Sequence, residues 1–477
     1  MKILLFNTGG YESITPVFNK ATLSAKGFIS SLGLLYVATV TARSGAHDVQ
    51  VHDTSYPENY PKWLPKVLQD FKPDVVGITA YSPTFPCTWH VARMTRRYAP
   101  RAHVVVGGPH TSLYPAEIAA LDEVDCVVIG DGEFIFQTVM ERFETGDHLG
   151  GIRGIAWKDG TRVIINDPSP PIENLDDIPF PDRTLLQGPE CGLVVDPPVK
   201  TTSIITARGC PFHCTFCCQK HRPYQLRSLQ NVFKELDVLI GQGYRHINVY
   251  DETFNADRKR LESFVNELLL RRYPITWTFR GMVDFFDRDI ARKMSASGLR
   301  RVNLGIESAS DRMLRLYNKH YFNHRELAVS VRNLRKEGIE VLGYFLVGGP
   351  TETVVEVQQT LQLAINLKLD YAQFNPLMPI PGTPVYEMAS EDPAFGDYIA
   401  EYFNNPSQQF EWRFWETTID TPTMAELISH MLRRFYFNRE FLLRHMLRWS
   451  SWQRFGGQIK PALIIAKQAL SSKLSRI

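Results

Sequence analysis

Several features that would define whole classes of protein are scarce in this chain of 477 residues. It has only seven cysteines, too few and too clustered for a disulfide framework, which favours a reducing compartment such as the cytoplasm. No apolar run reaches the roughly 18–20 residues that a spanning helix needs. The first residues, Met1 to Phe6, lack the pattern of a signal peptide. The net charge is only +2, and no nucleic-acid recognition motif occurs. We therefore expect a cytoplasmic protein that contacts membranes at most peripherally and binds no nucleic acid.

Three of the cysteines form the most informative motif. Cys210, Cys214 and Cys217 have the spacing C-x3-C-x2-C and follow the run Ser203–Ala207, which we predict to be a strand that Gly209 ends. Thiolates this close together can reach one metal centre, and iron–sulfur clusters prefer soft thiolate ligands, normally four. With only three, one iron would stay open for a substrate or cofactor.

The same spacing is compatible with a structural zinc site. His213, Cys218 or His221 would then supply the fourth ligand of a closed tetrahedral set. Cys218 is more readily a bystander, because its side chain should point away from that of its neighbour. On spacing alone, iron–sulfur and zinc readings both stay open.

The cysteine motif resembles the signature of the radical S-adenosylmethionine (SAM) superfamily, and the aromatic Phe216 before the third cysteine fits as well. The resemblance implies a [4Fe-4S] cluster on Cys210, Cys214 and Cys217, with SAM chelating the open iron. In this family one electron cleaves SAM to a 5′-deoxyadenosyl radical. An electron donor such as flavodoxin or ferredoxin is therefore an expected partner.

Residues 1–145 alternate short apolar runs with amphipathic patterns, which predicts five β/α units and a doubly wound, Rossmann-like parallel sheet. Ligands of such sheets bind beyond the carboxyl ends of the strands. The expected strands are Ile3–Phe6, Val49–His52, Val75–Thr79, Val104–Gly107 and Val127–Ile129, and the expected helices are Leu32–Ser44, Tyr60–Phe71, Thr88–Tyr98, Pro115–Leu121 and Phe134–Glu144.

No G-x-G-x-x-G follows the first strand, so a dinucleotide site is weakly supported. The segments Gly33–Tyr36, Gly107–His110 and Gly130–Glu133 instead resemble signatures of the flavodoxin-like cobalamin-binding domain that precedes the radical SAM domain in one large subfamily. No D-x-H-x-x-G is present, so no histidine ligand to cobalt is assigned. The alternative is a Rossmann-like domain that binds a nucleotide or only a partner. The resemblance implies cobalamin contacts from Thr8, Gly9, Ser82, Gly107, Gly108, Gly130, Gly132 and Glu133.

Residues 146–200 are expected to link two domains through a hairpin at an Asp-Gly turn and a proline-rich extended segment. From residue 201 to about 390, six further β/α units predict a partial TIM barrel, the radical SAM domain. Its strands are expected at Ile204–Ala207, His246–Tyr250, Thr276–Phe279, Val302–Gly305, Val341–Val347 and Tyr371–Asn375, with helices such as Arg258–Arg271 and His324–Lys336.

Acidic, basic or glycine residues follow these barrel strands, where barrel chemistry is found. This clustering argues for an enzyme, because a structural zinc knot would not need it. Relatives often carry an arginine of the SAM site where this chain has Met282. We assign the role of that arginine to Arg280, which faces the same side of the strand. No catalytic acid or base is identified. By resemblance, the SAM contacts are Glu252, Arg280, Glu307, Ser308, Gly348 and Gly349.

Residues 391–477 are expected to form a helical, basic region. Between Leu432 and Ile477 there are ten Lys or Arg residues and one Glu. Basic amphipathic helices can lie on an anionic membrane or face an acidic partner. Equally, the helices could cap the barrel and leave their arginines solvated.

Together the resemblances imply a cobalamin-dependent radical SAM enzyme. The commonest outcome is C-methylation at an unactivated carbon of a small or lipophilic substrate, such as a natural product, lipid or tetrapyrrole. The architecture also resembles the anaerobic magnesium-protoporphyrin monomethyl ester cyclase. A methylthiotransferase acting on transfer RNA is disfavoured, because Cys87, Cys126 and Cys191 are too scattered to bind a second cluster. The non-enzymatic alternative is a corrinoid- or metal-binding sensor.

Overall fold

The chain forms two compact units in a computed structural model. One unit comprises Met1–Ile14, Ser30–Pro189 and Ile399–Trp412, and the other comprises Thr15–Ile29, Glu190–Tyr398 and Arg413–Ile477. We call them the N-terminal and the central unit. The structure describes residues 1–9, 27–28, 31–43, 45–54, 60–188, 192–193, 196–218, 222–320, 322–404 and 412–446.

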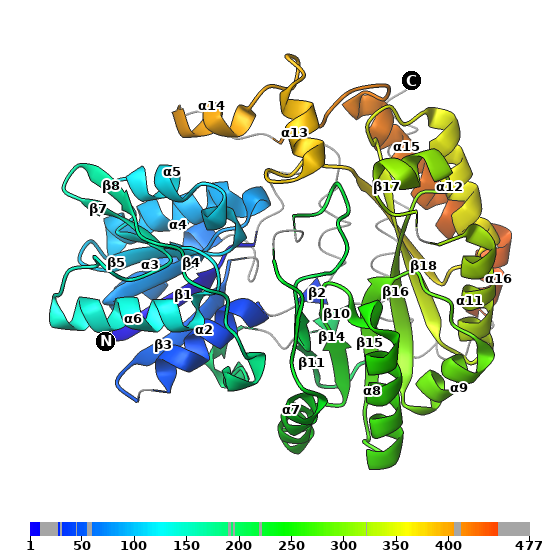
Figure 1. Ribbon diagram of the computed structural model, residues 1–477, viewed down its shortest axis with the longest axis horizontal. Helices are drawn as coiled ribbons and strands as arrows, with labels where there is room; N and C mark the ends of the chain where they lie inside the picture. Colours follow the sequence, from blue (N-terminus) through cyan, green and yellow to red (C-terminus); the bar gives the residue numbers. More distant parts are fainter. Residues whose placement is uncertain are drawn as a thin grey trace. The chain divides into compact units, whose positions relative to one another are not determined.

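Within the described residues, the N-terminal unit is built on an eight-stranded sheet (Figure 1). Its parallel centre has the order β3-β1-β4-β5-β6, the flavodoxin-type order in which the chain switches direction between β1 and β4. The predicted doubly wound sheet is confirmed, and every predicted strand end lies within one residue of the observed one. The strands are β1 (Lys2–Asn7), β3 (Asp48–Asp53), β4 (Val75–Thr79), β5 (His103–Gly107) and β6 (Cys126–Val128).

Helices cover both faces of this sheet, as a doubly wound sheet requires. Helices α2 and α6 pack against each other, and so do α3 and α4 (Figure 1). Strand β4 is buried along its whole length, because both of its faces are covered. The helices are α2 (Leu32–Ala42), α3 (Tyr60–Phe71), α4 (Phe85–Tyr98), α5 (Pro115–Ala120) and α6 (Gly132–Thr145).

The predicted hairpin forms and extends the sheet. Strand β7 (Ile155–Asp159) pairs antiparallel with β6, and β8 (Arg162–Ile165) pairs with β7. At the opposite edge, β9 (Leu186–Gln187) adds to β3 in parallel. Part of the segment predicted as a connector therefore belongs to the N-terminal sheet.

The central unit carries a six-stranded parallel sheet whose strands follow one another in chain order. Sequential parallel order with helices between the strands is the arrangement of a partial TIM barrel, which confirms that prediction. The strands are β11 (Thr201–Ile204), β14 (His246–Val249), β15 (Thr276–Met282), β16 (Leu299–Glu307), β17 (Glu340–Val347) and β18 (Tyr371–Pro376). The helices between them are α7 (Leu229–Gly241), α8 (Arg258–Arg271), α9 (Arg288–Ala296), α10 (Asp311–Leu316), α11 (His324–Lys336) and α12 (Val354–Asn366).

The first barrel strand differs from its prediction. It ends at Ile204, three residues before the expected end at Ala207. The amides of Thr206 and Ala207 donate to the carboxylate of Asp251, 2.6 and 3.1 Å away, instead of to a neighbouring strand. The chain therefore leaves the sheet early. Ala207 and Arg208 form β12, which pairs antiparallel with β13 (Gln225–Leu226) and closes the cysteine loop at its base.

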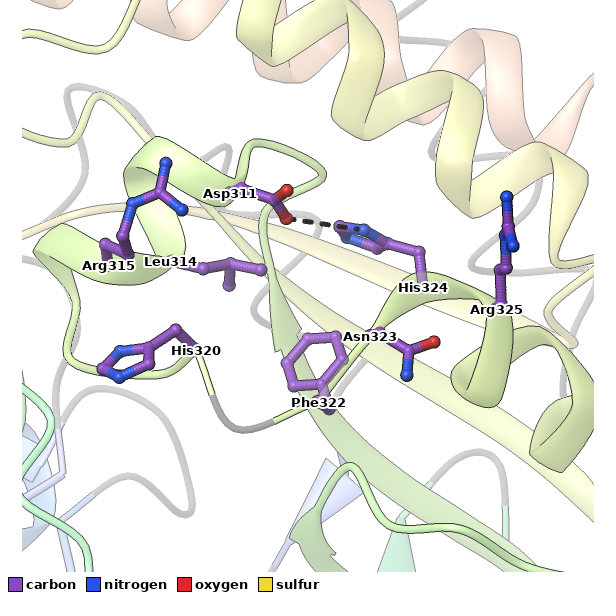
Figure 2. A pocket seen from close by; sticks show the side chains of 8 residues that line it. All are labelled: Asp311, Leu314, Arg315, His320, Phe322, Asn323, His324 and Arg325. Atoms are coloured by element: carbon purple, nitrogen blue, oxygen red, sulfur yellow. Dashed lines mark ion pairs between the residues drawn. The ribbon is translucent and has the colours of Figure 1, made fainter.

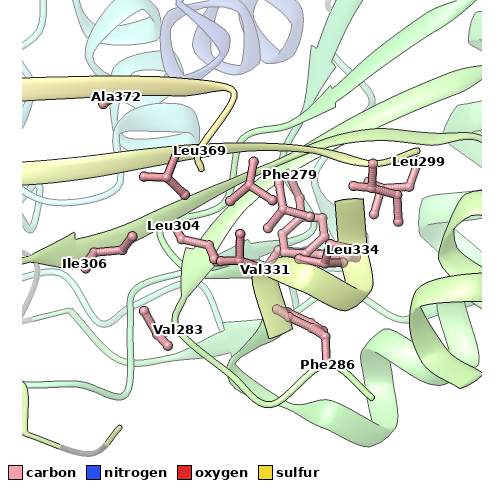
Figure 3. Packing of buried hydrophobic residues seen from close by; sticks show 14 of the residues in the cluster. Phe279, Val283, Phe286, Leu299, Leu304, Ile306, Val331, Leu334, Leu369 and Ala372 are labelled. Atoms are coloured by element: carbon pink, nitrogen blue, oxygen red, sulfur yellow. The ribbon is translucent and has the colours of Figure 1, made fainter. Parts of the chain in front are cut away.

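The barrel strands separate an apolar layer from a polar layer. On β16, Val302, Leu304 and Ile306 join the core, whereas Arg301 and Asn303 alternate with them and hydrogen-bond to each other. Side chains of successive strand residues point to opposite faces, which explains this separation. Figure 3 shows Leu304 and Ile306 in the apolar layer that α11 covers.

The C-terminal segment covers the last strand of the barrel. The hydroxyl of Tyr436, on α15 (Thr421–Tyr436), both donates to and accepts from the backbone of Ala372 on β18. Helices α13 (Pro384–Ser390), α14 (Tyr398–Asn404) and α16 (Arg439–Met446) complete the described part. Helix α15 therefore covers the last barrel strand, whereas most of α14 belongs to the N-terminal unit. Of the predicted helical, basic region, residues 405–411 and 447–477 lie outside the described residues. Among the helices that are described, none has the length and apolarity to cross a membrane.

Candidate active site

The carboxyl ends of β1 and β4 meet where the N-terminal sheet changes direction. Thr8, just after β1, is buried, and its hydroxyl donates to the carbonyl oxygen of Thr79 at 2.6 Å. The hydroxyl oxygen of Thr8 also lies 3.1 Å from the hydroxyl oxygens of Thr84 and Thr88. The Thr8 side chain therefore links β1 to β4. Because its hydroxyl is already bonded within the protein, a ligand would contact the backbone of Thr8 instead. Gly9 is fixed by two hydrogen bonds with Thr54, at 2.9 and 3.0 Å.

Ser82 and the predicted Gly107–Gly108 pair lie at the ends of β4 and β5. Gly108 has φ +104°, and a Cβ there would stand 2.8 Å from the carbonyl oxygen of Ala80, so glycine is required for this close approach. The Ser82 hydroxyl is 2.9 Å from Nδ1 of His110. Burial lowers the pKa of His110 to about 3, so this ring is neutral. Gly107 has ordinary packing against Val128.

The loop from β6 into α6 carries the remaining predicted cobalamin residues. Gly130 has φ +86° and no atom within 4 Å of the place a Cβ would take. Gly132 begins α6 and makes ordinary contacts, and Glu133 is buried in the first turn of that helix. A bare, left-handed backbone facing open space is the kind of surface that a large flat ligand can approach closely.

In the central unit, the cysteine loop is held from two sides. The amide and hydroxyl of Thr215 donate to the carbonyls of Tyr317 and Leu316 at 3.1 and 2.9 Å. Asn318 donates to the carbonyl of His213 at 2.9 Å. Phe216 packs edge-on against Tyr317, so the aromatic residue singled out in the motif anchors the loop.

The three motif thiols are partly buried and none is in a disulfide, whereas Cys218 is exposed. Burial raises the pKa of the Cys214 thiol, the positive charge of Lys319 opposes this, and the charges of Glu307 and Cys210 add to it. Sγ of Cys210 lies 3.4 Å from the hydroxyl of Thr253. Three thiols on one loop, none in a disulfide, fit the soft donor set of an iron–sulfur cluster.

Glu252 and Arg280 lie close together at the ends of β14 and β15. Arg280 donates to the carbonyls of Asp251 and Tyr250 at 2.9 and 3.2 Å and lies over the Tyr250 ring. Burial raises the pKa of Glu252, while a backbone hydrogen bond and the charge of Arg280, followed by those of Arg222 and Arg208, act in the opposite direction. A carboxylate next to a fixed guanidinium suits a zwitterionic amino-acid ligand such as the methionine part of SAM.

Glu307 ends β16 at a bulge and has φ +65°. It forms a buried ion pair with Lys319, with Nζ 2.6 Å from Oε1. A Cβ on Gly305 would lie 2.5 Å from both of these atoms, so the glycine leaves room for the pair. The ion pair also lies within electrostatic range of Cys214.

Ser308 and the glycines after β17 have mainly internal partners. The Ser308 hydroxyl accepts from the amide of Ser310 at 3.1 Å and helps to begin α10. The amides of Gly348 and Gly349 donate to Oε2 of Glu352 at 2.7 and 3.1 Å. Burial raises the pKa of Glu352 to about 7, against these two hydrogen bonds.

The structure thus places the central-unit residues at the carboxyl ends of successive barrel strands, with thiols, an acid–arginine pair and an ion pair on different loops. Among the described residues, no group of three His, Cys, Asp or Glu side chains has the geometry to hold a metal ion. The cluster ligands therefore stay a prediction. Sequence reasoning missed Asp251 and Lys319. Asp251 directly precedes Glu252, and strand alternation could have assigned it an inward position, whereas no local signal pairs Lys319 with Glu307.

Two family models match the chain. The B12 binding domain matches residues 19–140, and the Radical SAM superfamily matches residues 204–364. The matches follow the same order as the two sheets described above.

Individual relatives cover most of the chain. An uncharacterized methyltransferase of Pyrococcus horikoshii is 33% identical over 424 residues, which are 87% of this chain and 88% of that protein. The anaerobic magnesium-protoporphyrin IX monomethyl ester cyclase of Rubrivivax gelatinosus is 26% identical, over 85% of this chain and 74% of that protein.

Among solved structures, the radical SAM methyltransferase TsrM of Kitasatospora setae, with cobalamin and a [4Fe-4S] cluster bound, has the same fold. Its TM-score is 0.64 at 20% identity, and the match covers 82% of this chain and 78% of that one. The two family models, and the relative that matches 87% of this chain, agree with the two sheets. This chain therefore belongs to the radical SAM enzymes that carry a B12-binding domain, and the cofactors of that family are a [4Fe-4S] cluster, SAM and cobalamin.

Proposed function

We propose that this enzyme is a C-methyltransferase that acts on an unactivated carbon of a small or lipophilic substrate. The observation that supports this most is the similarity along 87% of the chain to a protein named as a methyltransferase. An oxidative ring closure is the second candidate, because a cyclase is 26% identical over a similar share of the chain.

The domain roles follow from the same proposal. Residues 1–145 bind cobalamin, residues 201–390 bind the cluster and SAM, residues 146–200 link them, and residues 391–477 form the helical region. Cys210, Cys214 and Cys217 are the proposed cluster ligands. Their half-buried thiols, none in a disulfide, lie on a loop that hydrogen-bonds to α10, which supports this assignment.

For SAM, we assign the amino-acid part to Glu252 and Arg280. Their opposite charges, fixed at adjacent strand ends, match an ammonium and a carboxylate. Gly348 and Gly349 present backbone that Glu352 holds in place. Glu307 and Ser308 stay in the proposed contact set, although Lys319 and Ser310 bond to their side chains.

For cobalamin, the proposed contacts are mainly backbone. Gly130 faces open space, and Gly108 leaves no room for a Cβ next to Ala80. Both observations support a flat surface of backbone at the strand ends, on which the corrin would lie. Gly9, Gly107 and Gly132 extend this backbone surface. The side chains of Thr8 and Ser82 bond within the protein and Glu133 is buried, so these three residues hold the surrounding loops in place.

When bound, the cluster and SAM supply a hydrogen-abstracting radical, and cobalamin supplies a transferable methyl group. The protein contributes positioning and exclusion of water, as is usual where cofactors carry the chemistry. Arg280, held by two carbonyls, fixes where a SAM carboxylate can sit. The buried Glu307–Lys319 pair adds little net charge at the end of β16.

The test uses SAM with a deuterated methyl group, the reconstituted enzyme, a reductant and a small-molecule extract. We expect 5′-deoxyadenosine and S-adenosylhomocysteine in equal amounts, with the deuterated methyl group on a carbon of one product. The Cys214→Ala protein is the matched control. Formation of 5′-deoxyadenosine without S-adenosylhomocysteine or label transfer would favour cyclisation, and no SAM cleavage at all would contradict both candidates.

A further inference from the structure

A hollow of about 590 Å³ opens on the central unit where α10 leads into α11. Figure 2 shows Arg315 and His320 at one end, Arg325 at the other, and Phe322 between them. The remaining lining residues are Asp311, Leu314, Asn323 and His324. We call this the α10–α11 surface.

The α10–α11 surface carries excess positive charge. Arg315, His320 and Arg325 are exposed, and the structure gives their side chains no hydrogen bond or ion pair with the described residues. Asp311 is the acidic member of the described lining, and it lies 3.8 Å from His324, as the dashed line in Figure 2 marks. Both arginine charges are therefore available to an incoming acidic partner.

The same segment is bonded directly to the cysteine loop. The last turn of α10 and the residues after it accept from Thr215 and donate to His213, the two residues that flank Cys214. His213 is itself exposed. A partner docked on the α10–α11 surface thus lies next to an exposed residue of the cysteine loop that directly precedes Cys214.

A protein fits this surface better than a small ligand does. Small-molecule sites are enclosed and mostly apolar, whereas the charged residues here are exposed. Electron-transfer complexes use small interfaces, and complementary charge in them mainly speeds association. Phe322 is partly buried between the cations, so it gives an apolar contact for the exposed edge of a flavin ring.

We propose that the α10–α11 surface docks a small acidic carrier of the flavodoxin type. The reduced flavin gives up one electron, and the cluster on the cysteine loop gains it. No bond to carbon forms or breaks in this step. The proposal rests on the cluster ligands assigned under the proposed function.

The experiment compares the reconstituted wild-type protein with Arg315→Glu/Arg325→Glu and Arg315→Gln/Arg325→Gln. Arg300→Glu is the matched control, because Arg300 is an exposed arginine at the opposite end of β16. Purified flavodoxin is titrated at low and high salt, and its hydroquinone is mixed with each protein in stopped flow. Dithionite reduction of each cluster is recorded separately.

Charge reversal should weaken flavodoxin binding and slow reduction by about tenfold or more at low salt, since steering effects have this size. The neutral variant should lie between, the Arg300→Glu control should match wild type, and dithionite should bleach all four proteins equally. Unchanged flavodoxin binding after reversal, or equal weakening in the control, would overturn the docking site. A wild-type protein that dithionite does not bleach would instead contradict the cluster assignment, and flavodoxin binding would still report on the surface by itself.

Discussion

The carboxyl ends of the two parallel sheets present contrasting surfaces. The N-terminal sheet ends in glycines and in hydroxyls that bond within the protein, such as that of Thr8. The central sheet ends in charged and nucleophilic groups, with Glu252 beside Arg280 and Cys214 near the Glu307–Lys319 pair. Topology places the ligand site in both cases, but the residues after each strand decide its chemistry. Bare backbone suits a large flat corrin, and paired charges suit a small zwitterion.

At each sheet end, burial shifts the pKa of a titratable side chain, downward for His110 and upward for Glu352. His110 is held neutral by burial, with a pKa of about 3. Burial raises the pKa of Glu352 to about 7. The segments around His110 and around Glu352 should therefore respond to pH in opposite directions, which makes the contrast measurable.

The largest expected effect concerns the three motif thiols at the central sheet end. Replacing Cys210, Cys214 or Cys217 by Ala should each abolish bound iron and the visible absorbance of the cluster, because three ligands leave no spare donor. Iron analysis and absorption spectra after anaerobic reconstitution measure this. Cys218→Ala is the matched control and should keep the cluster. A full cluster in any of the three single variants would break the ligand set.

The next effect separates two glycines of the N-terminal sheet end. Gly108→Ala should lower the free energy of unfolding by about 2 kcal/mol, since its left-handed backbone and its 2.8 Å approach to Ala80 both penalise a Cβ. Gly130→Ala should cost only about 1 kcal/mol, because just the left-handed backbone is penalised. Thermal unfolding of the protein without cobalamin measures both.

For cobalamin affinity we expect the opposite order, with the larger loss in Gly130→Ala and the smaller in Gly108→Ala. A methyl group at Gly130 projects into the space where we place the corrin, so hydroxocobalamin affinity should fall about tenfold or more, equivalent to about 1.4 kcal/mol. Equilibrium dialysis gives the affinity. Gly241→Ala, at the end of α7 in the central unit and with no atom within 4 Å of the new Cβ, should change neither quantity unfavourably. Unchanged cobalamin affinity in the Gly130→Ala protein would show that Gly130 is not one of the cobalamin contacts.

The smallest effect is the opposite pH response of these two segments. For His110 the folded pKa lies below the ordinary 6.5, so its contribution is present above pH 6.5 and is lost as pH falls toward 3. For Glu352 the folded pKa lies above the ordinary 4.5, so its contribution is present below pH 4.5 and is lost as pH rises toward 7. Each proton changes stability by up to about 1.4 kcal/mol per pH unit within its window.

Hydrogen exchange at pH 5 and pH 7.5 can assign these changes to β4–β5 and to β17–α12. The Glu352→Gln protein should lose the pH dependence around β17 but keep that around β4. The His110→Phe protein should do the reverse. If both segments kept their wild-type pH dependence in both variants, burial of these two groups would not be its source.

The sequence predicted the strands more securely than the contacts of the site residues. Every strand of the N-terminal sheet centre was placed within one residue, because continuous apolar runs bounded by glycine and polar residues are a local signal. The first barrel strand was wrong at its end, because Asp251, more than forty residues later in the chain, takes the amides of Thr206 and Ala207. A side chain that competes for backbone bonds over that separation leaves no local trace.

The linear order of residues by itself determined the two parallel sheets, the cysteine spacing and the glycines at strand ends, since each depends on neighbours a few positions away. Only the folded chain decided that Lys319 pairs with Glu307, that the Ser308 hydroxyl turns inward, and that the α10–α11 surface adjoins the cysteine loop. These depend on which loops converge at a strand end. Side-chain partners across such loops are selected by geometry and burial, which local sequence does not encode.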